Sequence, residues 1–422
     1  MFFDLALIGV AFPTMVETTD KSARHAMTRE SATDGRRAIG ASDVLRGRDI
    51  LCFSHDWSGD PLSKTHLMRL LARQNRVLWV NSIGYRTPSV SKQDLGRALR
   101  KLRAAVTPLS EPEPNLFVLN PLVVPSYAHP TVTAFNRRFL GYQVRRAMRC
   151  LRFRRPINWV FNPAAGMIAG ELGESQLIYH CVDEYSAFSG VRARALAAME
   201  RQLLRKAALV IVSSERLYET KAQVNPRCVL VRHGVDFHHF RKSLEPTTSI
   251  SSEIAHLPRP VIGYFGLIAS DWVDVRLLLH VAQSFPDASL VMLGKIAMNV
   301  DELERLPNVH LLGRKPYETL PNYCKGFDVA LIPFPINQAT LHSNPLKARE
   351  YLAAGLPVVS TAIPEVEALH HCQIGENPES FVREIRRALV DGGPKAWRSD
   401  TVRTEGWEAR LEEIRRHLAD LQ

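Results

Sequence analysis

Residues 49–80, DILCFSHDWSGDPLSKTHLMRLLARQNRVLWV, combine two short apolar runs with a helical pattern between them. The runs Asp49–Phe53 and Arg76–Val80 have the length and composition of buried strands. Between them, Leu67, Leu70 and Leu71 recur on one face of a helix. Strand, helix and strand within about thirty residues form a βαβ unit, whose two strands run parallel. This stretch therefore predicts an α/β protein with a largely parallel sheet.

Similar apolar runs follow in two series, with helical patterns between them. The first series is Leu116–Leu119, Ile157–Phe161, Leu177–Tyr179, Leu209–Val212 and Cys228–Val231. The second is Val261–Phe265, Ser289–Leu293, Val309–Leu312, Val329–Ile332 and Pro357–Ser360. Two such series predict two Rossmann-like domains that face a central cleft, because ligands of open α/β sheets bind at the carboxyl ends of the strands.

A polar segment with Pro246 separates the two series and is the expected linker. The tail after it is charged and helical in pattern, with Trp407 as its expected anchor. The predicted division is a poorly ordered leader at 1–48, an acceptor-binding domain at 49–240, the linker at 241–258, a donor-binding domain at 259–385 and C-terminal helices at 386–422.

The composition is that of a globular protein, with 45% hydrophobic and 23% charged residues among 422. A formal net charge of +11 favours an anionic partner: nucleic acid, an acidic membrane surface or phosphorylated substrates. The six cysteines are scattered, which argues against a disulfide framework and a zinc site and fits a reducing compartment. The apolar start lacks a basic segment and contains Asp4, so a cleaved signal peptide is not expected and a cytoplasmic location is predicted.

Residues 134–155 contain eight arginines and no acidic residue. An apolar seam of Leu140, Val144, Met148 and Leu151 recurs through them at helical spacing. Such a helix can pack its seam on the sheet and leave its arginines in water. It can also present them to an anionic bilayer, and both can hold together. The arginines expected at the membrane are Arg145, Arg146, Arg149 and Arg152.

A second helix is expected between Pro345, placed to begin it, and Gly355, placed to end it. Lys347 and Glu350 are three residues apart and therefore share one face of this helix. A diphosphate can bind at a helix N-terminus beside a lysine, and a carboxylate can accept hydrogen bonds from two ribose hydroxyls. Taken alone, the two residues also fit a solvated ion pair.

The whole segment, Ser343–Thr361, resembles the donor-binding signature of the GT-B glycosyltransferases. The resemblance is to the family-4-like group (glycosyl transferases group 1) of bacterial exopolysaccharide and teichuronic-type biosynthesis. It extends over residues 49–370 and includes 179–188, 231–236, 261–266, 271–274, 306–313, 315–321 and 326–334. The chain is also similar to xanthan-type glucuronosyltransferases, in which a lysine and a polar residue three positions later bind the pyrophosphate and ribose of the donor.

The resemblance implies a glycosyltransferase that uses a nucleoside diphosphate sugar as co-substrate, with no other cofactor and no metal. Its implied donor-binding residues are Gly266, Asp274, Asn344, Lys347 and Glu350. Two positions depart from the family pattern: His342 replaces the first of two paired glutamates, and Leu267 follows Gly266 where basic residues are usual. Contact with the pyrophosphate is therefore expected from Lys347 and helix N-termini.

The acceptor side is expected in the first domain. Asp183 follows a strand and is a candidate base for the acceptor hydroxyl, although an aspartate there also fits a helix N-cap. His180 is a second candidate in the same loop or a structural histidine. The loop His55-Asp56-Trp57 suits an acceptor site, with Trp57 as a platform and Asp56 alternatively a helix cap.

These features predict transfer of a sugar to a saccharide or lipid-linked saccharide, at the inner face of the membrane. Two alternatives are a nucleotide-sugar 2-epimerase of the same fold and a non-catalytic relative that binds membrane or nucleic acid. Nucleic acid is not an expected partner of the transferase.

Overall fold

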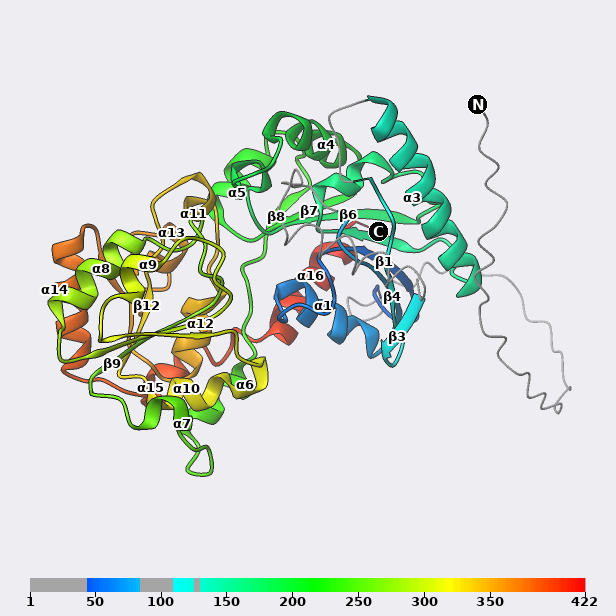
Figure 1. Ribbon diagram of the computed structural model, residues 1–422. Helices are drawn as coiled ribbons and strands as arrows, with labels where there is room; N and C mark the ends of the chain where they lie inside the picture. Colours follow the sequence, from blue (N-terminus) through cyan, green and yellow to red (C-terminus); the bar gives the residue numbers. More distant parts are fainter. Residues whose placement is uncertain (1–43, 84–108, 125–129, 422) are drawn as a thin grey trace, which may run out of the picture.

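The computed structural model describes residues 44–83, 109–124 and 130–421. These residues form two lobes, each built on its own sheet (Figure 1). The sheet of the N-terminal lobe has the order β3-β4-β2-β1-β5-β6-β7-β8, and only the β3–β4 pair is antiparallel. Its strands are β1 (Asp49–Phe53), β2 (Arg76–Val80), β3 (Leu109–Glu113), β4 (Leu116–Leu119), β5 (Ile157–Val160), β6 (Gln176–Cys181), β7 (Leu209–Val212) and β8 (Cys228–Leu230).

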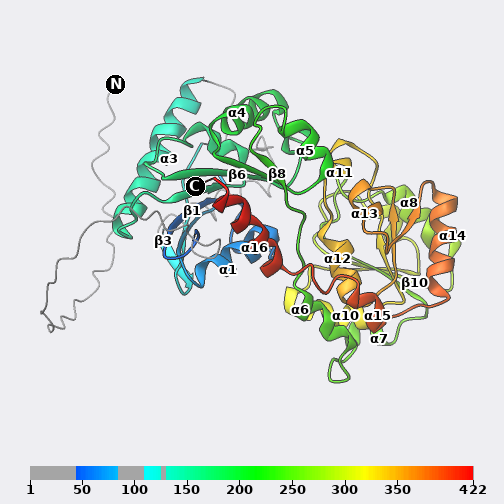
Figure 2. The same cartoon turned by 180° about the vertical axis from the view of Figure 1, so that it is seen from behind.

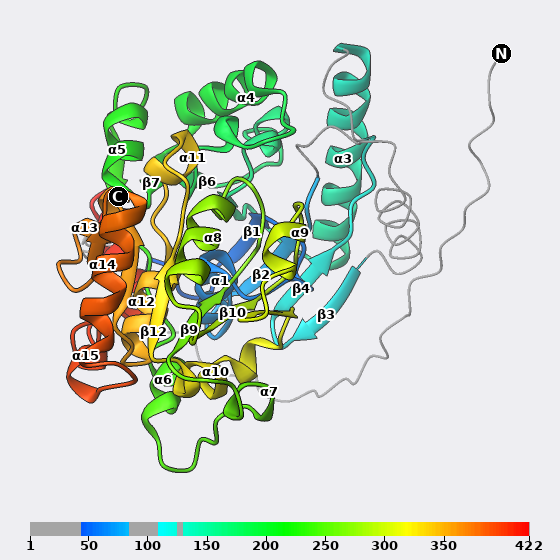
Figure 3. The same cartoon turned by 60° about the vertical axis from the view of Figure 1, so that its left-hand side comes forward.

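The predicted βαβ unit is confirmed, because β1 pairs in parallel with β2 from Asp49 opposite Arg76 to Phe53 opposite Val80. The helices of this lobe are α1 (Ser63–Ala72), α3 (Pro130–Cys150), α4 (Ala193–Lys206) and α5 (Glu215–Lys221), with short 3₁₀ turns at Pro163–Met167 and Tyr185–Ala187. In Figures 1 and 3, α3 lies at the outer side of the N-terminal lobe, apart from the helices of the C-terminal lobe.

The sheet of the C-terminal lobe is parallel throughout, in the order β11-β10-β9-β12-β13-β14. Its strands are β9 (Val261–Phe265), β10 (Ser289–Leu293), β11 (Val309–Gly313), β12 (Val329–Ile332), β13 (Val358–Thr361) and β14 (Gln373–Gly375). Its helices are α8 (Val275–Ser284), α9 (Asp301–Glu304), α10 (Leu320–Gly326), α11 (Gln338–Leu341), α12 (Leu346–Ala353), α13 (Pro364–Glu367), α14 (Pro378–Leu389) and α15 (Ala396–Asp400). Between β8 and β9 along the chain come α6 (Phe237–Arg241), a 3₁₀ turn at Lys242–Leu244 and α7 (Ser252–Ala255). A further 3₁₀ turn, Tyr317–Thr319, follows β11.

Each lobe has its own apolar core, and Trp272 packs against both. The last helix, α16 (Trp407–Ala419), returns to the N-terminal lobe, where it lies beside α1 (Figure 2). Its apolar face belongs to the core of that lobe, with Trp407 only 5% exposed, as expected of an anchor. The chain thus passes between the two lobes twice, once before β9 and once before α16.

All six cysteines are free thiols. Over the described ranges, no helix combines the length and apolar character that a bilayer span requires.

Candidate active site

Helix α12 ends in the way that the sequence predicts. Gly355 has a φ of +80° directly after the helix. Its N–H donates to the carbonyl of Leu352 at 2.7 Å, and the N–H of Leu356 donates to that of Tyr351 at 3.0 Å. This pair of bonds is a Schellman motif, which favours glycine at this position. At the other end, Pro345 is the N-cap residue and not the first helical residue, so the helix begins one residue later than predicted, at Leu346.

The side chain of Lys347 lies at the carboxyl end of the central strand β9. A Cβ atom at Gly266, just beyond that strand, would lie 2.2 Å from Cε and 2.6 Å from Nζ of Lys347. The ammonium is 5.7 Å from the ring of Tyr264 and 5.6 Å from that of Phe334. Burial lowers the pKa of Lys347, against the attraction of Glu350. The structure therefore brings together Gly266, Lys347 and Glu350, at the edge where ligands of such sheets bind.

The carboxylate of Glu350 accepts no hydrogen bond from any described residue. Burial raises the pKa of Glu350 to about 7, with Lys347 lowering it and Asp236 raising it further. The hydroxyl of Tyr317 is buried without a hydrogen-bond partner in the described chain, and burial raises its pKa, with the charge of Glu350 raising it further. A buried polar group without a partner is costly, so the Tyr317 hydroxyl, together with the half-buried carboxylate of Glu350, fits a site that a polar ligand completes.

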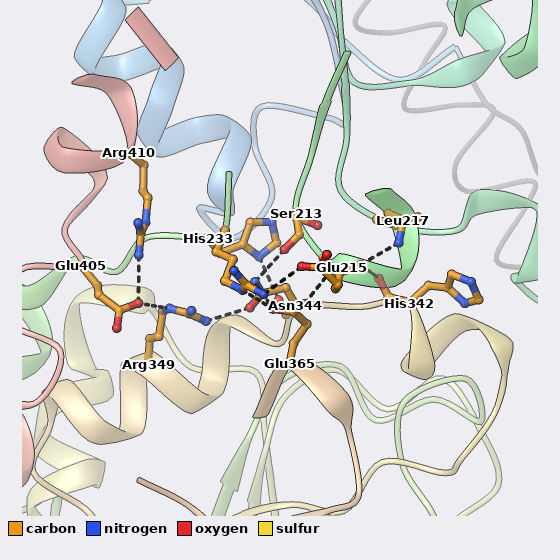
Figure 4. A network of polar contacts seen from close by, with 12 residues as sticks. Ser213, Glu215, Leu217, His233, His342, Asn344, Arg349, Glu365, Glu405 and Arg410 are labelled. Atoms are coloured by element: carbon orange, nitrogen blue, oxygen red, sulfur yellow. Dashed lines mark hydrogen bonds and ion pairs between the residues drawn. The ribbon is translucent and has the colours of Figure 1, made fainter. Parts of the chain in front are cut away.

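Asn344 connects the two lobes. Its Nδ2 donates to the carbonyl of Ser213 at 2.7 Å, and its Oδ1 accepts from Nη1 of Arg349 at 2.7 Å. Its own carbonyl lies 2.8 Å from Nδ1 of His233 (Figure 4). The polar atoms of the Asn344 side chain are thus already engaged, and its contact with a donor stays a prediction.

Glu365 is a second centre of this interlobe network. It is 3% exposed and accepts from the N–H of Glu215 and from Nε of Arg232, each at 2.8 Å. Ser214 donates to the carbonyl of His342 at 2.6 Å, and the ring of His342 points away from the network in Figure 4. His342, which stands where the family has a glutamate, therefore contributes its backbone carbonyl to the contact between the lobes.

Asp274 caps helix α8. Its carboxylate accepts from the N–H of Leu277 at 3.0 Å, so this oxygen satisfies one of the free donors of the first helical turn. Binding of the donor by Asp274 stays a prediction, and the structure shows that Asp274 also caps a helix.

Asp183 lies at the end of β6, as expected. Burial raises its pKa, Lys64 lowers it and Glu184 raises it. Its side chain makes no hydrogen bond to a described residue, and the 3₁₀ turn that follows has Glu184 as its N-cap, without a side-chain bond. The alternative reading of Asp183 as a helix cap is therefore not what the structure shows, whereas a carboxylate with free oxygens suits a base.

His180 is 2% exposed and lies in the core of the lobe. It stacks on Phe161 with ring centroids 4.8 Å apart, and Nε1 of Trp159 lies 3.4 Å from its Nδ1. Burial lowers its pKa well below the usual value. The structure thus places His180 as the structural histidine that the sequence left open.

The loop after β1 is held against β2 and the segment after it. The rings of His55 and Trp57 meet that of Trp79 edge to face at 5.3 and 5.0 Å, and Asp56 accepts from the N–H of Ser82 at 3.0 Å. Asp56 is therefore not the cap of α1, whose N-cap is Leu62. Nε2 of His55 is buried without a partner in the described chain.

The seam of α3 packs on the sheet, with Leu140 and Val144 fully buried. The arginines at 145, 146, 149 and 152 are exposed. The same outer face carries Phe135 and Tyr142, which are 54% and 50% exposed.

Solved structures share this two-lobed arrangement. Sucrose-phosphate synthase of Thermosynechococcus elongatus is similar with a TM-score of 0.64 and 16% identity, over 87% of this chain and 97% of that one. HepE of Anabaena, solved in complex with UDP-glucose, has a TM-score of 0.57 and 15% identity over 88% and 98%. These likenesses show the fold, and the GT-B prediction is confirmed.

Sequence comparison decides the class of enzyme. The model of the family Glycosyl transferases group 1 matches residues 259–391. TuaH of Bacillus subtilis strain 168, which carries the name of a teichuronic acid biosynthesis glycosyltransferase, is 27% identical over 287 residues, 61% of this chain and 70% of that protein. The chain is a GT-B glycosyltransferase.

This glycosyltransferase also has polar residues near the candidate site and between the lobes that the sequence analysis did not identify. Lys64, Tyr185 and Tyr317 are examples, and Arg349 and Glu365 join the lobes. Lys64 lies one turn before Leu67, at the start of the helix that follows the first predicted strand. This position shortly after the end of a strand is the sequence feature that could have identified Lys64 as a site residue. Among the described residues, no cluster of three or more His, Cys, Asp or Glu side chains could hold a metal ion.

Proposed function

We propose that this glycosyltransferase moves a sugar from a nucleoside diphosphate sugar to a saccharide or lipid-linked saccharide in polysaccharide biosynthesis. The observation that carries the proposal is the Lys347 ammonium at the end of β9, one helical turn from Glu350. TuaH is named for the synthesis of a polysaccharide, and HepE was solved with UDP-glucose, which supports this class of donor and product.

On the donor side, Lys347 would neutralise the diphosphate as the sugar leaves. A positive group held in advance stabilises the negative charge that develops on the leaving phosphate. Glu350, together with the hydroxyl of Tyr317, would hold the ribose hydroxyls, because a carboxylate has two accepting oxygens. These contacts would fix the anomeric carbon at the cleft.

On the acceptor side, Asp183 would take the proton of the acceptor hydroxyl. The oxygen then bonds to the anomeric carbon as the bond to the β-phosphate breaks and its electron pair passes to the phosphate. Direct displacement of this kind inverts the anomeric carbon, so the configuration of the product checks the role of Asp183.

The outer face of α3 would bind the inner, anionic surface of the membrane. It combines the exposed aromatic side chains of Phe135 and Tyr142 with arginines, the pattern of helices that lie in a bilayer interface. Arg138 and Arg145 also line a cavity of about 310 Å³ beside this helix, which suits a lipid phosphate. Docking there would bring a lipid-linked acceptor to the enzyme.

Calorimetric titration with UDP and GDP tests the donor site. We expect one of them to bind, and Glu350→Ala to weaken binding at least about tenfold, the effect of losing about 1.4 kcal/mol. Glu376→Ala, an exposed glutamate of the same lobe, is the matched control. Binding of neither nucleotide, or unchanged binding in Glu350→Ala, would refute the site. A converted free nucleotide sugar without acceptor product would refute transfer.

A further inference from the structure

Lys64 is a buried lysine of the N-terminal lobe. It stands in the first turn of α1 and is 8% exposed. Its Nζ donates to the hydroxyl of Tyr185 at 3.0 Å and lies 5.5 Å from the ring of Tyr185 and 5.9 Å from that of Phe161. An ammonium has three donors, and a neutral hydroxyl does not compensate the burial of its charge.

The compensating charge is that of Asp183. Burial lowers the pKa of Lys64, and the nearby carboxylate of Asp183 opposes this more strongly than the thiols of Cys52 and Cys181. Lys64 and Asp183, both described residues, form no ion pair, because their nitrogen and oxygen atoms are more than 4.0 Å apart. The attraction between them therefore acts over a longer distance.

The other charged neighbour of Asp183, Glu184, raises its pKa and shares a single cation with another carboxylate. Glu184 pairs with Lys221 at 2.8 Å, and Lys221 also pairs with Glu200 at 2.9 Å. Lys64 is therefore the cation that acts on Asp183. The remaining titratable groups that feel Lys64 are imidazoles kept neutral by burial, those of His55, His180 and His233.

We propose that Lys64 is a positioning residue of the acceptor site, whose buried ammonium holds Asp183 as a carboxylate while its bond to Tyr185 fixes the loop that carries Asp183. The proposal rests on the role of Asp183 as base. The loop is tied locally as well, because the N–H of Tyr185 donates to the carbonyl of Asp183 at 3.1 Å.

The physical need for Lys64 grows when the acceptor binds. An acceptor that fills the cleft removes water from Asp183, and burial favours the protonated form of a carboxyl group. A protonated Asp183 is too weak a base to take the proton of the acceptor hydroxyl. A fixed positive charge nearby opposes this protonation, and its effect is strong in a site with little water.

The experiment is the pH profile of kcat/KM for Lys64→Gln, with Tyr185→Phe as the matched control. Activity is present above the pKa of the base and lost as the pH falls through it. Because Lys64 lowers the pKa of Asp183, its loss moves the acidic limb to higher pH, by about one unit or more for a close opposite charge. Tyr185→Phe removes the hydrogen bond and no charge, so its limb stays in place even where its activity falls.

Further variants separate the possible failures. Lys64→Arg keeps the charge and is expected to keep the limb within a few tenths of a unit, and unchanged UDP or GDP affinity shows that Lys64→Gln is folded. A limb that stays in place in Lys64→Gln, or that moves equally in Tyr185→Phe or Lys64→Arg, overturns the role of Lys64. An Asp183→Asn variant with the full wild-type profile overturns instead the assignment of the base.

Discussion

The Lys347 ammonium occupies the space in which a side chain at Gly266 would begin. A Cβ built there lies 2.2 Å from Cε of Lys347, well inside van der Waals contact. Gly266 also has a φ of +141°, a conformation that residues with a side chain rarely adopt. The absence of a side chain at residue 266 is therefore part of what places the cation at the end of β9.

Gly266→Ala is expected to weaken nucleotide binding at least about tenfold, because Lys347 must move away from the end of the strand. Calorimetry with the nucleotide that the wild type binds measures the effect. Gly393→Ala is the control, since Gly393 has a φ of +77° but nothing within 4 Å of the added carbon. Equal losses of affinity in both variants would show that backbone strain, and not the displaced lysine, is responsible.

The raised pKa of Glu350 makes the stability of the unliganded enzyme depend on pH. Burial raises this pKa from 4.5 to about 7, so the protonated carboxyl favours the folded chain. This contribution is complete below about pH 4.5 and is lost as the pH rises through 7. Glu350→Gln should therefore nearly match the wild type at pH 4.5 and be more stable by about 3 kcal/mol at pH 8.5. Thermal unfolding at both pH values tests this, and a constant difference between them would contradict it.

Nucleotide binding should show the opposite dependence. A protonated Glu350 loses accepting capacity for the ribose hydroxyls, so the affinity of the wild type rises between pH 6 and 8, on either side of the pKa of about 7. The affinity of Glu350→Gln is expected to be lower and nearly constant over this range. Titrations at several pH values, with Glu376→Gln as the control, measure it. A pH-dependent affinity retained in Glu350→Gln would assign the titration to another group.

Glu365→Ala is expected to destabilise the protein by about 1–3 kcal/mol, because it leaves the N–H of Glu215 without its buried partner and removes one of the two ion pairs of the half-buried Arg232. Glu367→Ala on the same helix is the control, since Glu367 is exposed. Urea unfolding followed by tryptophan fluorescence measures the difference. Equal midpoints for the two variants would mean that the interlobe network contributes little.

The triple variant Arg138→Gln, Arg145→Gln and Arg149→Gln should bind anionic vesicles about a hundredfold more weakly, at about 1 kcal/mol for each charge. The control removes three exposed arginines of α14, Arg383, Arg386 and Arg387. Vesicle sedimentation with and without anionic lipid measures binding. Equal effects of the two triple variants would indicate attraction by net charge alone.

The sequence predicts most of the strands because their signal is local. Runs such as Val261–Phe265 are apolar throughout, as buried parallel strands are, and the structure has them at the predicted bounds. β3 (Leu109–Glu113) was missed, because an edge strand is exposed and carries the polar sequence LSEPE. β14 was missed as well, since three residues hold no recognisable period.

The helix that carries Lys347 and Glu350 could likewise be predicted from the sequence, because helical spacing and the glycine at residue 355 are properties of one short segment. The sequence by itself thus determined the alternation of elements, the class of fold and the face on which these two side chains lie. What it could not determine is which residues meet across the cleft.

Tertiary structure alone decided those contacts. Lys64 and Tyr185 are 121 residues apart, and only the pairing of β1 through β5 to β6 brings them to one edge of the sheet. The same holds for Asn344, whose amide joins the lobes, and for His180, which lies between aromatic rings. Local sequence sets the conformation of a segment, whereas burial and electrostatic neighbours depend on residues that are distant along the chain.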